Sequence, residues 1–271
     1  MATDEVQYSS IRPSNRVIQG LWIGAELSMM EQLSIASFLG NGHEYHLFVY
    51  DDVKNIPAGT VVRDGNEILP SSSIFKYRDR PSYAGFSNFF RYKLLLERGG
   101  WWADTDTVCL KAFDFEDEYV FSTEMSKGAE VVNCGVIKVP AHSELMRYAW
   151  ETCKTKRPEQ IVWGETGPRL MAQAVANFSL AGFRKPYFYF CPLGFWEWGK
   201  LLEPSEQSIV AEDSYAIHLW NEKWREVDQD KNGSYDAGCL YEQLKQKYLG
   251  SEASKSSRAS KHNNYAEPVA F

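Results

Sequence analysis

Residues 91–110, RYKLLLERGGWWADTDTVCL, contain the transition on which the fold depends. A helix-forming run ends at the pair Gly99-Gly100, and the aromatic pair Trp101-Trp102 follows directly. Glycine ends helices because it adopts a left-handed backbone conformation at little cost. The pattern therefore predicts a helix, a tight turn and a buried strand that stops at residues 104–106, Asp-Thr-Asp.

The two carboxylates of this stretch, Asp104 and Asp106, point to the same side if the chain is extended. They repel each other unless a cation lies between them. Mg²⁺ and Mn²⁺ accept carboxylate oxygens and keep further positions for phosphate, and α/β sheets bind ligands where their strands end. An isolated Asp-x-Asp triplet is more often a solvated turn than a metal site. The preceding helix, glycine pair and strand favour a metal site here.

Strands and helices alternate on both sides of this segment, which predicts an α/β sandwich around one mostly parallel sheet. A strand is expected at residues 17–24, a crossover helix at 26–39 and a second strand at 45–50. Near the start of a helix at 87–98, Ser87, Asn88 and Arg91 share one face. The other expected elements are strands near 60–63, 108–110, 119–122, 131–139, 187–191 and 215–219, helices at 143–153, 167–177 and 241–249, and an aromatic loop at 193–198.

The composition indicates one folded domain. With 271 residues and 44% hydrophobic residues, the chain can bury a substantial core. We expect a flexible N-terminus at residues 1–15, the domain at 16–249 and a disordered tail at 250–271, where Ser, Lys, Arg and Asn predominate.

Charge and cysteine content limit the classes of binding partner and the cellular compartment that we expect. The formal charge of −7 argues against nucleic acid as a main partner. The five cysteines are odd in number and well separated, which favours reduced, buried thiols in a cytoplasmic protein. No apolar run approaches the roughly 20 residues that cross a bilayer, so we expect no integral membrane segment, while peripheral membrane contact stays open.

Four stretches together resemble a known family: residues 86–106, FSNFFRYKLLLERGGWWADTD, with VIQGLWIG at 17–24, SIASFLGNGHEYHLFVYDD at 34–52 and AIHLWNEKW at 216–224. They are similar to glycosyltransferases with the DXD sugar-binding motif, over roughly residues 16–225. The family includes the initiating α-1,6-mannosyltransferase, α-1,4-galactosyltransferase and bacterial capsular polysaccharide enzymes. The resemblance implies a GT-A fold and a retaining, metal-dependent transfer.

The resemblance also implies roles for individual residues. Asp106 corresponds to the metal ligand, Asp104 to the residue that contacts the ribose and the metal-bound diphosphate, and Arg91 to the catalytic arginine that reaches the donor. The other matched positions are Trp22 and Gly24 beside the nucleotide base, Ser87 and Asn88 on the donor side of the helix, Asn133 near the transferred sugar, and His218 and Trp220 near the metal and diphosphate.

Some of these residues also have structural explanations. Arg91 could pair with a surface carboxylate, Trp22 could belong to the core, and His218 could be a buried, hydrogen-bonded histidine. One position departs from the family, because many relatives carry Asp where this chain has Asn88, and the donor sugar is therefore open. Glu165 is a candidate carboxylate on the acceptor side.

The resulting hypothesis is a glycosyltransferase that uses Mn²⁺ or Mg²⁺ to transfer a hexose from a nucleotide sugar to a carbohydrate acceptor. A UDP-sugar is favoured over GDP-mannose, and the acceptor is expected to be a surface polysaccharide or a lipid-linked oligosaccharide. A protein-modifying glycosyltransferase and a non-catalytic carbohydrate- or nucleotide-binding protein are the alternatives. The sequence leaves the sugar, acceptor, linkage and oligomeric state open.

Overall fold

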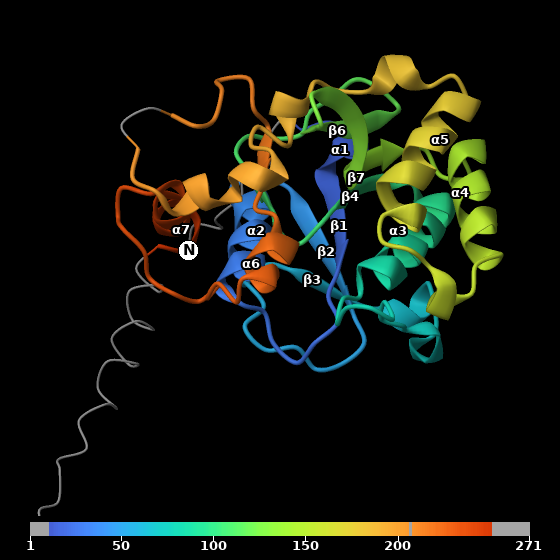
Figure 1. Cartoon of the computed structure of the whole chain (residues 1–271), viewed down its shortest axis with the longest axis horizontal. Coiled ribbons are helices and arrows are strands. Elements are labelled where there is room, and N and C mark those ends of the chain that lie inside the picture. Colours follow the sequence, from blue (N-terminus) through green and yellow to red (C-terminus); the bar gives the residue numbers. More distant parts are fainter. Residues whose placement is uncertain (1–10, 206–207, 251–271) are drawn as a thin grey trace, which may run out of the picture.

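A six-stranded sheet of order β3-β2-β1-β4-β7-β6 forms the centre of the computed structural model, which describes residues 11–205 and 208–250 (Figure 1). Strands β1 (Val17–Leu21), β2 (Glu44–Val49), β3 (Val61–Asp64) and β4 (Gly100–Ala103) pair in parallel. Strand β7 (Ala129–Val139) is antiparallel to both β4 and β6 (Val120–Ser126). The predicted α/β fold with a mostly parallel sheet is confirmed.

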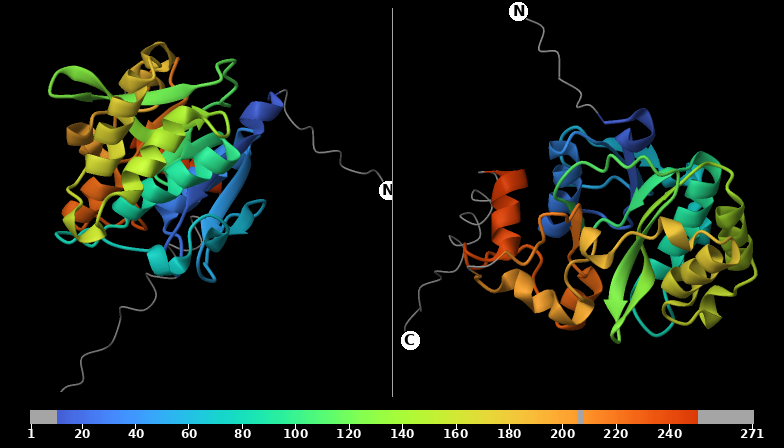
Figure 2. Two further views of the ribbon diagram at one scale, coloured as in Figure 1. Left: turned by 90° about the vertical axis from the view of Figure 1, so that its right-hand side faces the viewer. Right: turned by 90° about the horizontal axis from the view of Figure 1, so that it is seen from above.

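Helices cover both faces of this sheet (Figures 1 and 2). Helix α2 (Met29–Gly40) lies on one side, with α7 (Leu240–Leu249) packed outside it. Helices α3 (Ala84–Arg98), α4 (Glu144–Lys154) and α5 (Leu170–Asn177) lie on the other side. The remaining helical segments are α1 (Pro13–Arg16), α6 (Asn221–Glu226) and the short turns Gly65–Glu67, Ser71–Ser73, Pro158–Gln160, Glu165–Arg169, Ala181–Phe183, Tyr187–Tyr189 and Phe195–Leu202.

The tryptophan pair of β4 anchors both layers. Successive strand residues face opposite sides, so Trp101 packs into the core beneath α2 and Trp102 into the core beneath α3. The Trp101 ring lies 5.1 Å from that of Phe113, and the Trp102 ring lies 6.3 Å from that of Phe90. Because both rings are almost completely buried, β4 is held firmly up to the residue before Asp104.

A second, two-stranded sheet continues from the acidic stretch. Strand β5 (Thr107–Cys109) pairs antiparallel with β8 (Ala216–His218), and Thr107 lies opposite His218. This pairing brings the C-terminal segment beside Asp106. Asp104 thus directly follows a strand of the main sheet, whereas Asp106 directly precedes a strand of the small one.

The β6–β7 pairing contains a large irregularity near the end of β4. Thr123 pairs with Val132 and Phe121 with Ile137, so Ser122 faces residues 133–136 of β7. The Ser122 hydroxyl group donates to the carbonyl oxygen of Val136 at 2.8 Å. Bulges of this kind redirect side chains, often next to functional sites, and this one turns Asn133 and Gly135 toward the end of β4.

Two predictions for residues 187–198 are wrong. The expected strand at 187–191 is a 3₁₀ turn, Tyr187–Tyr189, in which the Cys191 amide donates to the Tyr187 carbonyl at 2.7 Å. Residues 187–191 form no strand pairing with the described part of the chain, and the bridge from Phe121 of the edge strand β6 to Arg184 lies before them. The aromatic run packs its rings instead of extending the sheet. The expected loop at 193–198 largely belongs to the 3₁₀ segment Phe195–Leu202.

The remaining boundaries agree closely with expectation. Ser143 caps α4 as predicted, accepting from the Met146 amide at 3.3 Å. Helix α5 begins at Leu170, after an irregular turn in which Gly167 is not helical. All five cysteines are free and buried, and within residues 11–205 and 208–250 no helix is long and apolar enough to cross a membrane.

The segments predicted to flank the domain, residues 1–15 and 250–271, lie mostly outside the described residues. Residues 1–10 and 251–271, in the predicted N-terminus and tail, are not described. Ile11 and Asn15 are buried, however, and the Asn15 side chain donates to the Phe115 carbonyl at 2.8 Å. The packed part of the chain therefore includes residues that the sequence assigns to the flexible N-terminus.

Candidate functional site

Asp104 is fixed at the end of β4 by contacts from three directions. Its backbone amide donates to the Gly135 carbonyl at 2.8 Å. Its Oδ1 accepts from the Trp102 indole at 2.8 Å and lies 2.9 Å from Nη2 of Arg91. The side chain is 25% exposed, so one side of the carboxylate is free to meet a ligand.

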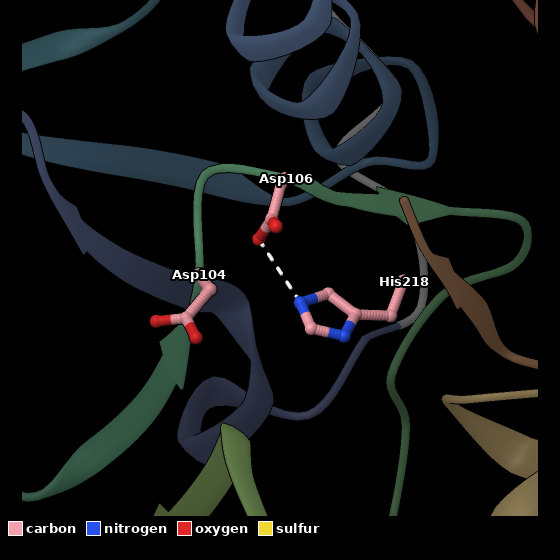
Figure 3. A group of neighbouring side chains, drawn as sticks. All are labelled: Asp104, Asp106 and His218. Carbon is pink, nitrogen blue, oxygen red and sulfur yellow. Dashed lines mark hydrogen bonds and ion pairs between the residues drawn. The ribbon is translucent and has the colours of Figure 1, made fainter. Parts of the chain in front are cut away.

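Asp106 is held from the C-terminal side of the site (Figure 3). Its Oδ1 lies 3.1 Å from Nε2 of His218, and its Oδ2 accepts from the Asn221 amide at 2.9 Å. The Leu219 amide donates to the Asp106 carbonyl at 2.8 Å. The carboxylate predicted from residues 104–106 therefore has its partners more than a hundred residues later in the chain.

These three side chains have the composition of a divalent metal site. One ligand atom from each of Asp104, Asp106 and His218 lies within 4.8 Å of the others. Burial raises the pKa of Asp104 above its ordinary value, because Arg91 offsets only part of that cost. Burial has the same tendency at Asp106, but His218 outweighs it and lowers the Asp106 pKa. A cation between the carboxylates would relieve their repulsion, so the residues present fit a bound metal.

Arg91 points into the site from α3. Its guanidinium group contacts Asp104, donates to the Cys134 carbonyl and to the Ser87 hydroxyl group at 3.2 Å, and lies 4.9 Å from the centre of the Trp102 ring. The residue is only 3% exposed. The alternative that Arg91 pairs with a surface carboxylate is wrong, because its carboxylate partner is Asp104 in the site.

Trp220 has a strained backbone at the rim of the site. Its φ of 60° and ψ of 49° lie in the left-handed region, which bulky residues rarely adopt. Its indole group donates to the Leu193 carbonyl at 3.0 Å, and its ring centre lies 4.1 Å from that of His218. Such conformations persist only where surrounding contacts impose them, and they cluster at functional sites.

A pocket of about 760 Å³ lies in front of these residues. Nine of the ten predicted site residues line it: Trp22, Ser87, Asn88, Arg91, Asp104, Asp106, Asn133, His218 and Trp220. Gly24 does not, although it lies against the Trp22 indole. The pocket is also lined by residues that the sequence did not single out, including Tyr77, Glu124, Trp163 and Lys231.

Asn88 and Glu165 have clearly different positions. Asn88 is 5% exposed and its amide group is 3.4 Å from the Thr166 hydroxyl group, so it forms part of the pocket's inner wall. Glu165 pairs with Lys156 at 2.6 Å and lines a separate cavity of about 300 Å³. The prediction that Glu165 serves the acceptor side of this pocket is not supported.

Comparison with known proteins identifies the region around the acidic pair. Residues 30–126 match the family model for the glycosyltransferase sugar-binding region containing the DXD motif. This part of the chain is therefore similar to DXD glycosyltransferases. The matched region holds Arg91, Asp104 and Asp106, whereas His218 and Trp220 lie beyond it.

Two solved glycosyltransferase structures illustrate the wider similarity. The PaToxG glycosyltransferase is 18% identical with a TM-score of 0.46, over 60% of this chain and 69% of that one. The apo-form glycosyltransferase GlyE of Streptococcus pneumoniae TIGR4 is 14% identical with a TM-score of 0.47, over 94% of this chain and 66% of that one. At these values neither similarity bears on the substrates of this protein. No curated protein matches the sequence.

Proposed function

We propose that this glycosyltransferase transfers a hexose from a nucleotide sugar to a carbohydrate acceptor, with a divalent metal and with retention of configuration. The observation that carries the proposal is the group Asp104, Asp106 and His218 beside a pocket of about 760 Å³. Pockets of this size bury most of a ligand as large as a nucleotide sugar.

Asp106 and His218 would hold the metal, with Asp104 as its neighbour on the main sheet. When bound, the metal would stabilise the negative charge that develops on the leaving diphosphate. An imidazole ligand suits Mn²⁺ better than Mg²⁺, which prefers oxygen ligands. We therefore favour Mn²⁺ as the cofactor.

Arg91 would add a fixed positive charge on the opposite side of Asp104. Its contacts with Ser87, Cys134 and Asp104 hold the guanidinium group in one orientation. A preorganised cation in a pocket that excludes water stabilises developing charge more effectively than a mobile one. In this proposal Arg91 stabilises the leaving diphosphate and does not transfer a proton.

The donor would lie between the first strand and the C-terminal segment. Trp22 follows β1 and would stack on the base, with Gly24 behind it, while Trp220 would cover the diphosphate. Ser87, Asn88 and Asn133 line the inner part of the pocket, where the hexose would lie. We favour a UDP-sugar as the donor.

The acceptor would enter past Tyr77 and Trp163. The two rings are 5.1 Å apart, and Trp163 is 37% exposed on the pocket wall. Tyr77 is only 4% exposed, so the ring of Trp163 would offer the apolar face on which a sugar ring packs. We propose a growing surface polysaccharide or lipid-linked oligosaccharide, modified in the cytoplasm, with a protein acceptor as the alternative.

Thermal unfolding and donor hydrolysis test the proposal together. With Mn²⁺ present, UDP or GDP should raise the melting temperature, because a ligand at about 100 times its Kd stabilises the folded state by about 2.7 kcal/mol. The same protein should slowly hydrolyse one member of a panel of UDP- and GDP-sugars. Metal-independent sugar binding without turnover would instead indicate a non-catalytic binding protein.

Asp106→Asn and Asp106→Ala should abolish both the Mn²⁺-dependent stabilisation by nucleotide and donor hydrolysis. The loss should exceed 100-fold, because removing one electrostatic contact to the transition state typically costs about 10²–10³ in rate. Asp213→Ala is the matched control, since Asp213 is exposed and outside the pocket. Full hydrolysis by both Asp106 variants with added Mn²⁺ would refute the metal role.

A further inference from the structure

Glu124 places a carboxylate on the wall of the pocket formed by the β6–β7 hairpin. It lines the pocket together with Asn133, Asp104 and His218. Its Oε2 accepts from the Asn133 side-chain amide at 2.5 Å. Among the described residues it has no lysine or arginine partner within ion-pair distance, which distinguishes it from Asp104.

The orientation of Asn133 fixes the position of this carboxylate. Asn133 is 5% exposed, and its Oδ1 accepts from the Gly135 amide at 2.5 Å. The amide nitrogen must therefore face Glu124. A β-carbon at Gly135 would lie 3.3 Å from Oδ2 of Asp104, so this hydrogen-bonded chain runs from Glu124 to the edge of the metal group.

Keeping the Glu124 side chain ionised in this environment costs free energy. Burial raises the pKa of Glu124, and the Asn133 amide and His218 offset only part of that effect. Glu124 is only partly buried, but a carboxylate in a pocket with a shifted pKa is a candidate functional residue. Supporting Asn133 alone would not need a charged group, because a glutamine oxygen accepts the same hydrogen bond.

We propose that Glu124 accepts hydrogen bonds from hydroxyl groups of the hexose that is transferred, and that it thereby determines which sugar the enzyme accepts. A carboxylate offers two oxygens that accept from neighbouring hydroxyl groups, and bonds to a charged acceptor are about twice as strong as neutral ones. This inference rests on the proposed function, because it places the hexose beside Asn133 and Asp104.

The test compares nucleotide binding with sugar turnover in Glu124→Gln and Glu124→Ala. The probes are UDP and GDP with Mn²⁺, and the sugar nucleotide that the wild-type protein hydrolyses fastest. A residue that contacts only the sugar should leave the Kd of the nucleotide within about twofold. It should lower kcat/KM for hydrolysis by on the order of 10- to 100-fold, the effect of losing one charged hydrogen bond.

Glu130→Gln is the matched control. Glu130 lies on the same hairpin and accepts from the Thr123 hydroxyl group and the Tyr187 amide at 2.5 and 2.7 Å, but it is outside the pocket. The Glu130→Gln variant should have the melting temperature and the hydrolysis rate of the wild type. Glu124→Gln preserves side-chain volume and the acceptor for Asn133, so an unchanged melting temperature shows that it is folded.

Donor analogues that lack single hydroxyl groups give the decisive comparison. If Glu124 contacts a hydroxyl group, the defect of Glu124→Gln should disappear with the analogue that lacks it, as in a double-mutant cycle. An equal defect with every analogue, or no defect at all in folded variants, would overturn the inference. Absence of any Mn²⁺-dependent nucleotide binding in the wild type would instead refute the proposed function.

Discussion

Gly135 is the residue at which the two halves of the candidate site meet. Its carbonyl group accepts from the Asp104 amide, and its amide donates to Asn133. A β-carbon there would lie 2.9 Å from Oδ1 of Asn133 and 3.3 Å from Oδ2 of Asp104. No other residue would leave both side chains in place.

Gly135→Ala should therefore impair turnover more than stability. The methyl group displaces the Asn133 amide and disturbs a buried hydrogen bond worth about 1–3 kcal/mol, which corresponds to about a 5- to 100-fold loss of kcat/KM if it is lost in the transition state. Hydrolysis kinetics and the melting temperature measure the two effects separately. Gly182→Ala should change neither, because no atom in the described part of the chain lies within 4 Å of the new methyl group. Equal activity in both variants would contradict this account of Gly135.

Residue spacing predicts one part of the site and not the other. Asp104 and Asp106 are two residues apart at the end of a strand, and Arg91 shares a helix face with Ser87. Local spacing is therefore enough to predict these residues as part of the site. Glu124 has no such signal. Its place in the pocket depends on the irregular pairing of β6 and β7, in which Ser122 faces residues 133–136, and that register cannot be read from either strand alone.

At the scale of elements, the turn between α3 and β4 sets the direction in which β4 leaves the helix. Gly99 has φ of 61° and ψ of −157°, a conformation almost restricted to glycine. A β-carbon there would lie 2.3 Å from the Ala141 amide nitrogen. The turn is thus packed directly against the connection between β7 and α4.

Gly99→Ala should destabilise the protein by more than the backbone cost of about 1–3 kcal/mol, because the Ala141 segment must also move. Chemical denaturation gives the free energy of unfolding. Gly250 provides a matched comparison, with φ of 58° and ψ of −152° but no atom of the described residues within 4 Å of a new methyl group. If Gly250→Ala were as destabilising as Gly99→Ala, the steric explanation would fail.

Sequence patterns predicted elements best where a hydrophobic run coincided with a boundary residue. Helix α4 has its serine cap, and α3 has its terminal glycine pair. The run at 187–191 has the same composition as a strand, but the rings of Phe190 and Phe115 pack 5.9 Å apart. The bridge to β6 is at Arg184, before the run begins. Whether an aromatic run extends a sheet depends on the free edge beside it, which composition does not reveal.

At the scale of the whole molecule, Asp114 ties the start of the described chain to the loop after β5. Its Oδ1 accepts from the Asn15 side chain at 3.0 Å and from the Arg12 amide at 3.1 Å. The Asn15 hydrogen bond and Arg12 hold the pKa of Asp114 below its ordinary value. The same Asn15 side chain accepts from the Trp101 indole at 3.0 Å, so this contact reaches the main core.

Asp114→Asn should reduce the acid sensitivity of the fold. Because the pKa of Asp114 is lower in the folded state, its stabilising effect is present above the unfolded value of about 3.9 and is lost as the pH falls through the folded value. The carboxylate is partly exposed, so the effect at neutral pH should be only about 0.2–1 kcal/mol. Urea denaturation at about pH 6 and pH 3 measures it, and a variant with the wild-type loss between these values would contradict the prediction.

The position of the acidic pair between the two sheets has a consequence for stability as well as for chemistry. Asp104 directly follows β4 of the six-stranded sheet, and Asp106 directly precedes β5 of the two-stranded sheet that includes β8. An ion shared by these carboxylates and His218 would span the boundary between the sheets. A bound metal would therefore link the C-terminal part of the chain to the main sheet. With metal bound, the two sheets should unfold together, and without it the two-stranded sheet should unfold at a lower temperature.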